Sequence, residues 1–255
     1  MADPRAPSAT HASGLDHALR APWALGLLVL LAALPPVASA TGGEFYISLA
    51  SRILAFALAA TSLNLILGFG GMVSFGHAAF LGIGAYATAI MAQHGIHSAW
   101  VAWPAAMAVA ALAALVVGAI SLRTQGVYFI MITLAFAQML YFLMISLKAY
   151  GGDDGISLPG RSRLAAGFDL ADDTRFYYVV LGLAALGFLA VWRILNTRFG
   201  HALQAIRENE TRMQAIGFAT TRYKLAAFTL AGALAGLAGR SEERRVGKEC
   251  LRLCR

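Results

Sequence analysis

Residues 101–120 have the sequence VAWPAAMAVAALAALVVGAI, which contains no charged side chain. An α-helix of about 20 apolar residues is long enough to cross the hydrocarbon core of a bilayer, which is roughly 30 Å thick. A helix that is apolar on every side is buried by lipid or by other apolar helices. This stretch therefore predicts a transmembrane helix.

Similar stretches occur along most of the chain. Hydropathy gives seven apolar segments, at residues 23–40, 45–67, 73–91, 101–120, 127–147, 176–195 and 223–239. Of the 255 residues, 59% are hydrophobic and 13% are charged, against about 45–50% and about 25% in soluble domains. We therefore predict an all-α, polytopic transmembrane helical bundle over residues 23–239, preceded by a cytoplasmic tail at residues 1–22. Disordered, collagen-like and disulfide-rich classes are excluded.

Lysine and arginine in the loops predict the orientation of the bundle. With the N-terminus inside the cell, the inner loops carry nine basic residues and the outer loops five, so we expect a cytoplasmic N-terminus. The loop at residues 148–175 would then lie outside, where its length suggests a surface that meets a partner. The first segment ends in Ala38-Ser39-Ala40 and also fits a cleavable signal peptide. Cleavage there would leave the orientation of the other helices unchanged.

Residues 240–255 differ in composition from the rest of the chain. They hold six of the 20 basic residues, three of the 13 acidic ones and both cysteines, so the net charge of +7 falls to +4 over residues 1–239. The run RSEERRVGKEC begins directly after Gly239 and looks like the translation of a sequencing-library adapter. We expect a non-native tail and a reading frame lost after Gly239. The alternative is a native basic tail that binds anionic lipid. Without the tail, the charge does not imply a nucleic acid partner.

Residues 64–86, NLILGFGGMVSFGHAAFLGIGAY, contain six glycines. Each glycine weakens a helix by about 1 kcal/mol relative to alanine in water, so we predict a broken helix. Broken helices are tolerated in membranes only where the freed backbone is buried in protein or lines a cavity. Asn64, Ser74, Gly76 and His77 lie beside the break and are our candidates for a translocation pathway. Alternatively, the glycines allow close helix packing and His77 forms an interhelical hydrogen bond, which is the simpler explanation for His77 taken alone.

Residues 196–217, NTRFGHALQAIRENETRMQAIG, predict an amphipathic helix that stops at Gly217. The residues of its apolar stripe recur at spacings of three, four and seven: Phe199, Leu203, Ile206, Met213 and Ile216. Glu208 and Arg212 have the spacing of an i,i+4 ion pair. Such a helix lies in the membrane interface or places its stripe in the groove of a partner. Glu208 and Glu210 interrupt the basic face typical of lipid binding, which favours a partner protein.

Signals for catalysis and cofactor binding are lacking in the sequence. No GxxxxGK[ST] motif is present, so the chain cannot bind nucleotide through a P-loop. No Ser-His-Asp, Cys-His or paired-carboxylate arrangement suggests catalysis, and His94 and His97 have no third metal ligand nearby. We therefore predict neither an enzyme nor a resident cofactor or metal. Gly232 and Gly236 form a GxxxG face suited to helix packing.

Residues 64–86, 123–138 and 198–217 together resemble the membrane-spanning permeases of branched-chain amino acid ABC importers. Within that family the chain is similar to the LivM-type subunit rather than to its LivH-type partner, over about residues 23–239. The resemblance implies a multi-pass protein of the bacterial inner membrane, paired with a second, LivH-like permease subunit. It also implies two cytoplasmic ATPase subunits that bind ATP and Mg²⁺, and a periplasmic binding protein that delivers leucine, isoleucine, valine or a related substrate.

The same resemblance implies that residues 199–217 form a coupling helix in a groove of the ATPase. The residues that would make or position this contact are Phe199, Gly200, Leu203, Ile206, Arg207, Glu208, Glu210 and Gly217. The loop at residues 148–175 would dock the binding protein. Family members usually continue through further helices after the position of Gly239, which agrees with the adapter interpretation of the tail.

A secondary transporter of a small solute is the alternative function. Such proteins more often carry an ionisable coupling residue inside a helix and show internal repeats. His77 is the one candidate for such a residue, and no clear repeat is present. We therefore expect an ATP-driven importer in which a partner chain hydrolyses ATP.

Overall fold

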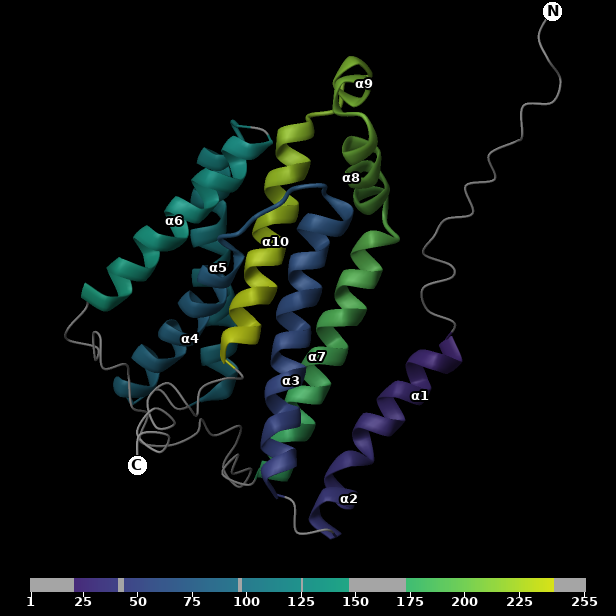
Figure 1. Cartoon of the computed structure of the whole chain (residues 1–255), viewed down its shortest axis with the longest axis vertical. Helices are drawn as coiled ribbons and strands as arrows, with labels where there is room; N and C mark the ends of the chain where they lie inside the picture. Colours follow the sequence, from purple (N-terminus) through teal and green to yellow (C-terminus); the bar gives the residue numbers. More distant parts are fainter. Residues whose placement is uncertain (1–20, 41–43, 96–97, 125, 147–172, 241–255) are drawn as a thin grey trace, which may run out of the picture. The chain divides into compact units, whose positions relative to one another are not determined.

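The computed structural model describes residues 21–40, 44–95, 98–124, 126–146 and 173–240 (Figure 1). The predicted N-terminal tail, most of the proposed docking loop and nearly all of the adapter-like tail lie outside these residues. The regular elements of the described residues are helices, with no strand among them. The predicted all-α class is therefore confirmed.

The chain divides into two units, at residues 1–44 and 45–255. The first unit contains α1 (Ala21–Ala32) and α2 (Leu34–Ala40), which are separated at Ala33. Proline is tolerated at positions 35 and 36 because the backbone N–H groups in the first turn of a helix make no hydrogen bonds within that helix. The first predicted apolar segment thus forms two short helices.

The helices of the second unit follow the other six predicted segments to within a few residues. They are α3 (Glu44–Asn64), the π-helical turn η1 (Leu65–Phe69), α4 (His77–Gln93), α5 (Ala99–Ser121), α6 (Val127–Ser146), α7 (Asp173–Leu195), α8 (Arg198–Glu208), α9 (Glu210–Ala215) and α10 (Thr220–Arg240). Within the described residues, four stretches are long and apolar enough to cross a membrane: Phe45–Phe69, Trp100–Ser121, Val127–Ser146 and Asp173–Leu195. The predicted polytopic membrane bundle is therefore confirmed.

Helix α10 packs against both α4 and α5, and small residues bring the backbones together (Figure 1). A Cβ at Gly236 would collide with the Cβ of Ala110 on α5, and one at Gly232 would collide with Ala114. Gly84 of α4 meets the backbone of Gly236 in the same way. Since apolar helices in lipid gain little from the hydrophobic effect, such close packing is a main source of their association. The GxxxG packing face predicted at Gly232 and Gly236 is confirmed.

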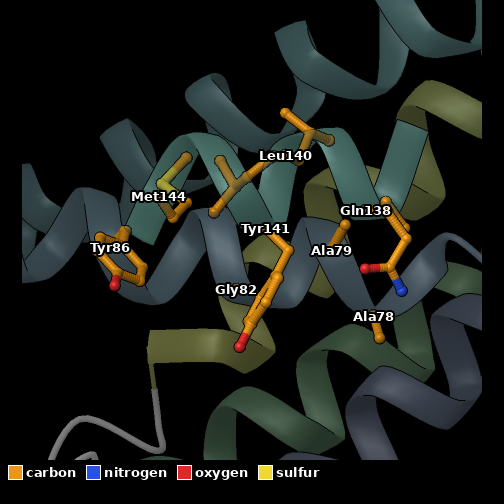
Figure 2. Close-up of a pocket in the computed structure, with 10 residues that line it drawn as sticks. Ala78, Ala79, Gly82, Tyr86, Gln138, Leu140, Tyr141 and Met144 are labelled. Carbon is orange, nitrogen blue, oxygen red and sulfur yellow. The ribbon is translucent and has the colours of Figure 1, made fainter. Parts of the chain in front are cut away.

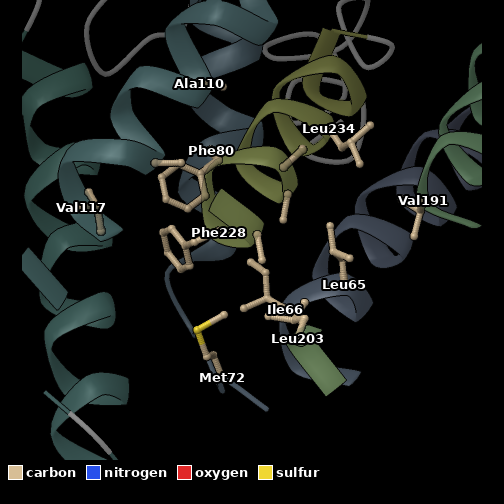
Figure 3. Close-up of a cluster of buried hydrophobic side chains, with 14 of the residues drawn as sticks. Leu65, Ile66, Met72, Phe80, Ala110, Val117, Val191, Leu203, Phe228 and Leu234 are labelled. Atoms are coloured by element: carbon tan, nitrogen blue, oxygen red, sulfur yellow. The ribbon is translucent and has the colours of Figure 1, made fainter. Parts of the chain in front are cut away.

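A buried cluster continues this contact toward α6 and α8 (Figure 3). The ring centroids of Phe80 and Phe228 lie 5.6 Å apart at an interplanar angle of 89°, and those of Phe129 and Phe228 lie 6.3 Å apart at 80°. Edge-to-face pairs of this kind are favourable beyond the area they bury. The same cluster includes Leu65 of η1 and Leu203 of α8, so one core joins the broken helix to the amphipathic helix.

Candidate functional site

The helix that begins with α3 breaks where the glycines predict. After η1, the backbone N–H of Gly70 donates to the Leu65 carbonyl oxygen (3.2 Å) and that of Met72 to the Ile66 carbonyl oxygen (3.1 Å). Gly71 has a φ of +66°, which favours glycine over residues with a side chain. Residues 71–76 are non-helical, and α4 begins at His77. A π-helical turn followed by an irregular segment leaves backbone groups without helical partners, as the sequence predicts.

His77 is tied to α3 at this break. Its Nε2 lies 2.8 Å from Ser62 Oγ, and Ser62 Oγ also donates to the Ala59 carbonyl oxygen at 2.7 Å. Because a hydroxyl has one hydrogen to donate, this arrangement makes Nε2 the donor and leaves Nδ1 as an acceptor. The alternative interpretation of His77 as an interhelical hydrogen bonder is therefore confirmed.

Two buried polar atoms at the break have no hydrogen-bond partner within the described part of the chain. They are Nδ1 of His77 and Oγ of Ser74, and their side chains are 6% and 5% exposed. An unsatisfied buried polar group costs about 1–3 kcal/mol. These two atoms can therefore form hydrogen bonds with a polar solute or a water molecule at the break.

The other two predicted pathway residues serve the geometry of the break. Asn64 is exposed, and its side chain lies where a Cβ of Gly68 would be. Gly76 meets the backbone of Thr133 on α6, and any side chain there would collide with the Thr133 carbonyl oxygen. The four candidates thus lie around one break, and none of them lines the cavity between α4 and α6.

A cavity lies beside the break, between α4 and α6 (Figure 2). It has a volume of about 350 Å³. Its walls come from two short stretches: Ala78, Ala79, Gly82, Ile83 and Tyr86 on α4, and Ala137, Gln138, Leu140, Tyr141 and Met144 on α6. Sequence reasoning missed these residues as site candidates, although Gln138 is a lone amide within an otherwise apolar predicted span.

The predicted amphipathic helix is two helices, which corrects the sequence interpretation. Asn209, with φ −153° and ψ 95°, separates α8 from α9, and its Oδ1 accepts a hydrogen bond from the Arg212 backbone N–H at 2.9 Å. Asparagine caps helix N-termini well because its side chain satisfies a free N–H there. The break takes Glu208 and Arg212 out of helical register, so the predicted i,i+4 ion pair does not form.

The α8 part of the apolar stripe faces the chain's own core. Leu203 is 0% exposed and Ile206 2% exposed. Phe199 stacks on Tyr223 of α10, with ring centroids 5.6 Å apart at 21°. Gly200 lets α8 return close to the end of α7, since a Cβ there would collide with the Leu195 carbonyl oxygen. These side chains are used within the bundle, so the expectation that the whole stripe enters a partner's groove is wrong for α8.

The α9 part of the stripe remains accessible. Ile216 is 66% exposed, and Phe218, just beyond α9, is 38% exposed. Gly217, with φ +94°, follows the end of α9 and confirms the predicted stop. Two polar contacts hold α9 to α10: Lys224 Nζ lies 2.7 Å from Glu210 Oε2, and Gln214 Nε2 donates to Thr220 Oγ1 at 3.1 Å.

One side chain connects α8 to the broken helix. The guanidinium of Arg207 donates a hydrogen bond to the carbonyl oxygen of Gly68. Its aliphatic stem covers Gly71, where a Cβ would come within 2.8 Å of Arg207 Cγ. The neighbouring Glu208 is exposed. Arg207 therefore contacts this chain's own backbone at the break.

A polytopic bundle with a broken helix, and a surface helix pair bonded to that break, is the architecture of a membrane permease. The family model described as "Branched-chain amino acid transport system / permease component" matches residues 45–241, and the chain belongs to this family. The family is described as the permease component of a transport system.

Three curated relatives are similar in sequence. Two are named "High-affinity branched-chain amino acid transport system permease protein LivM": that of Salmonella typhimurium is 30% identical and that of Escherichia coli 29% identical, each over 84% of this chain and 55% of the relative. A "Probable branched-chain amino acid transport permease protein LivM" of Methanocaldococcus jannaschii is 32% identical over 49% of this chain and 37% of the relative. The chain thus spans about half the length of the first two relatives. No solved structure matches it.

Proposed function

We propose that the protein is the permease subunit of an ATP-driven importer of branched-chain or related amino acids in a bacterial inner membrane. The family and the names of the relatives support the substrate class. In this proposal the N-terminus is cytoplasmic, and α8 and α9 lie on the cytoplasmic side. The partners are a LivH-like permease subunit, two ATPase subunits that bind ATP and Mg²⁺, and a periplasmic binding protein.

The hydrogen bond from Arg207 to the Gly68 carbonyl oxygen is the observation that carries this proposal. It connects α8 to the segment that precedes Ser74 and His77, whose unpartnered polar atoms suit the translocation pathway. An ATPase that moved α8 would therefore also pull on the break. No cofactor is assigned to this chain, because the energy enters through the partner.

The accessible apolar residues Ile216 and Phe218 offer a contact for the ATPase. They follow α9, which is connected to α8 at Asn209. The Glu210–Lys224 ion pair holds α9 against α10. In this proposal α8 and α9 together form the coupling element that contacts the ATPase. Its position against the bundle is set by the α8 residues Phe199, Gly200, Leu203 and Ile206. Arg207 and Glu210 link it to the bundle, Gly217 ends it, and Glu208 stays on its exposed side.

Uptake of labelled leucine into proteoliposomes tests the proposal. The full-length permease, its partner subunits and its binding protein should accumulate leucine when ATP is inside, and should not do so with a non-hydrolysable analogue. An Ile216→Ser variant should lose co-purifying ATPase. A His201→Ala variant, altered at an exposed residue near the other end of α8, should retain it. Uptake that persists without ATP would instead favour the secondary transporter.

A further inference from the structure

The cavity between α4 and α6 has one wall built from small residues. Ala78, Ala79 and Gly82 lie on the α4 side, whereas Leu140, Tyr141 and Met144 face them from α6. Figure 2 shows the side chains of Gln138 and Tyr141 extending from α6 across α4. The volume of about 350 Å³ falls in the range of about 300–1,000 Å³ that is typical of small-molecule pockets.

Among the residues that the structure describes, none packs against the position of a Gly82 side chain. Nothing lies within 4 Å of a Cβ built there, in contrast to Gly84, whose Cβ would collide with Gly236. Gly82 is helical and its φ is not positive, so backbone conformation does not demand glycine either. Glycine inside a helix is disfavoured by about 1 kcal/mol relative to alanine in water. What glycine provides at position 82 is open space in the cavity.

The chemistry of the walls suits a neutral solute with an aliphatic part. Ile83, Leu140 and Met144 are apolar, and none of the lining residues is charged, so a solute with net charge would enter without a counter-ion. Gln138 offers an amide, and Tyr86 and Tyr141 offer hydroxyls. None of these three groups makes a hydrogen bond to another side chain or backbone group in the described residues. They are therefore available to the amino and carboxylate groups of a zwitterion.

We propose that this cavity holds the transported aliphatic amino acid during its passage, with Gly82 setting the size of side chain that fits and Gln138 and Tyr141 contacting the zwitterionic group. The proposal rests on the proposed function and names a substrate contact within the permease itself. In this proposal the residues that contact the substrate are different from Arg207, which links α8 to the break.

Substrate discrimination in the complete reconstituted importer tests it. A Gly82→Val substitution fills the open space, and Gly182→Val on α7 is its matched control because a Cβ at Gly182 also has nothing within 4 Å but lies outside the cavity. One misplaced methyl or methylene group changes discrimination by about tenfold or more. We expect Gly82→Val to lower kcat/KM for leucine relative to valine by about tenfold, while Gly182→Val leaves the ratio unchanged. The same binding protein serves every variant, so a changed ratio reports the permease.

Two further variants test the same cavity without altering Gly82, in case Gly82→Val fails to fold. Gln138→Leu and Tyr141→Phe should raise KM for both leucine and valine, and Tyr128→Phe, at an α6 tyrosine outside the cavity, should leave both KM values unchanged. Equal leucine-to-valine ratios in wild type and Gly82→Val, together with normal KM in the other two variants, would overturn the proposal.

Photo-crosslinking separates this inference from the proposed function. A diazirine analogue of leucine, applied to the whole complex, should label peptides containing residues 78–86 or 137–144, and excess leucine should compete. If wild type shows no ATP-dependent uptake but this competed labelling occurs, the cavity proposal stands and the proposed function fails. Labelling only elsewhere, or a co-purifying lipid in the cavity that leucine does not displace, contradicts the cavity proposal.

Discussion

Arg207 and Gly68 are 139 residues apart in the sequence, yet the Arg207 guanidinium hydrogen-bonds the Gly68 carbonyl oxygen. The acceptor is accessible because the helix ahead of it changes to a π-helical turn and then breaks. The donor lies on α8, an amphipathic helix whose apolar side is buried in the same core. The Arg207–Gly68 hydrogen bond and the core shared by Leu65 and Leu203 both link α8 to the break.

Replacing Arg207 by lysine or alanine should uncouple transport from ATP hydrolysis. A hydrogen bond from a charged group contributes about 1.5–3 kcal/mol, so we expect leucine uptake per ATP hydrolysed to fall about tenfold. Because Arg207 contacts this chain rather than the partner, the ATPase should still co-purify. Loss of the ATPase with normal membrane insertion would instead place Arg207 in the subunit interface.

Replacing Ser62 by alanine should destabilise the bundle at the break. The substitution removes the partner of His77 Nε2, which is buried, and an orphaned buried polar group costs about 1–3 kcal/mol. We expect a lower melting temperature of the purified protein in detergent. Thr61→Ala is the matched control, since Thr61 is partly exposed and bonds only its own helix at the Ala57 carbonyl oxygen. An equal effect of both variants would refute the special role of the Ser62–His77 contact.

Reversing the charges of Glu210 and Lys224 tests how α9 is held. Surface ion pairs contribute about 0.2–1 kcal/mol and are screened by salt. The side chains of this pair are partly buried, Lys224 at 16% and Glu210 at 25% exposed, and a single reversal places two like charges together, so it should reduce coupled uptake. The double variant Glu210→Lys with Lys224→Glu should restore it by re-forming the pair. Uptake assays at low and high ionic strength provide the measurement. Failure of the double reversal to recover activity would mean that one of the two residues acts elsewhere.

A leucine at Gly236 should prevent α10 from packing. Its side chain would meet Ala110 and the Ala106 carbonyl oxygen on α5. Overpacking of well-filled contacts costs about 1–3 kcal/mol or more, so we expect aggregation in size-exclusion chromatography or a lower melting temperature. Gly182→Leu, on an open face of α7, should behave as wild type.

The positions of the membrane helices were predictable because length and hydropathy report directly on lipid burial, and the break was predictable because glycine acts locally. The role of Leu203 and Ile206 was not, since an amphipathic stripe has the same pattern whether its apolar side meets its own core or a partner. Asn209 separates α8 from α9, and its side chain caps the start of α9 through a hydrogen bond that competes with an otherwise continuous helical period. The cavity needed three-dimensional information, because Gly82 and Gln138 become neighbours only when α4 packs on α6.

The place of α10 has a consequence for how the protein is made. Its glycines contact both α4 and α5, although α10 is synthesised after every other described helix. While the nascent chain emerges, α4 and α5 stand in the bilayer with the surface meant for α10 still open to lipid. Biogenesis must therefore keep α4 and α5 from pairing with unrelated helices until α10 is inserted, which makes the delay between inserting α5 and inserting α10 the vulnerable interval in assembly.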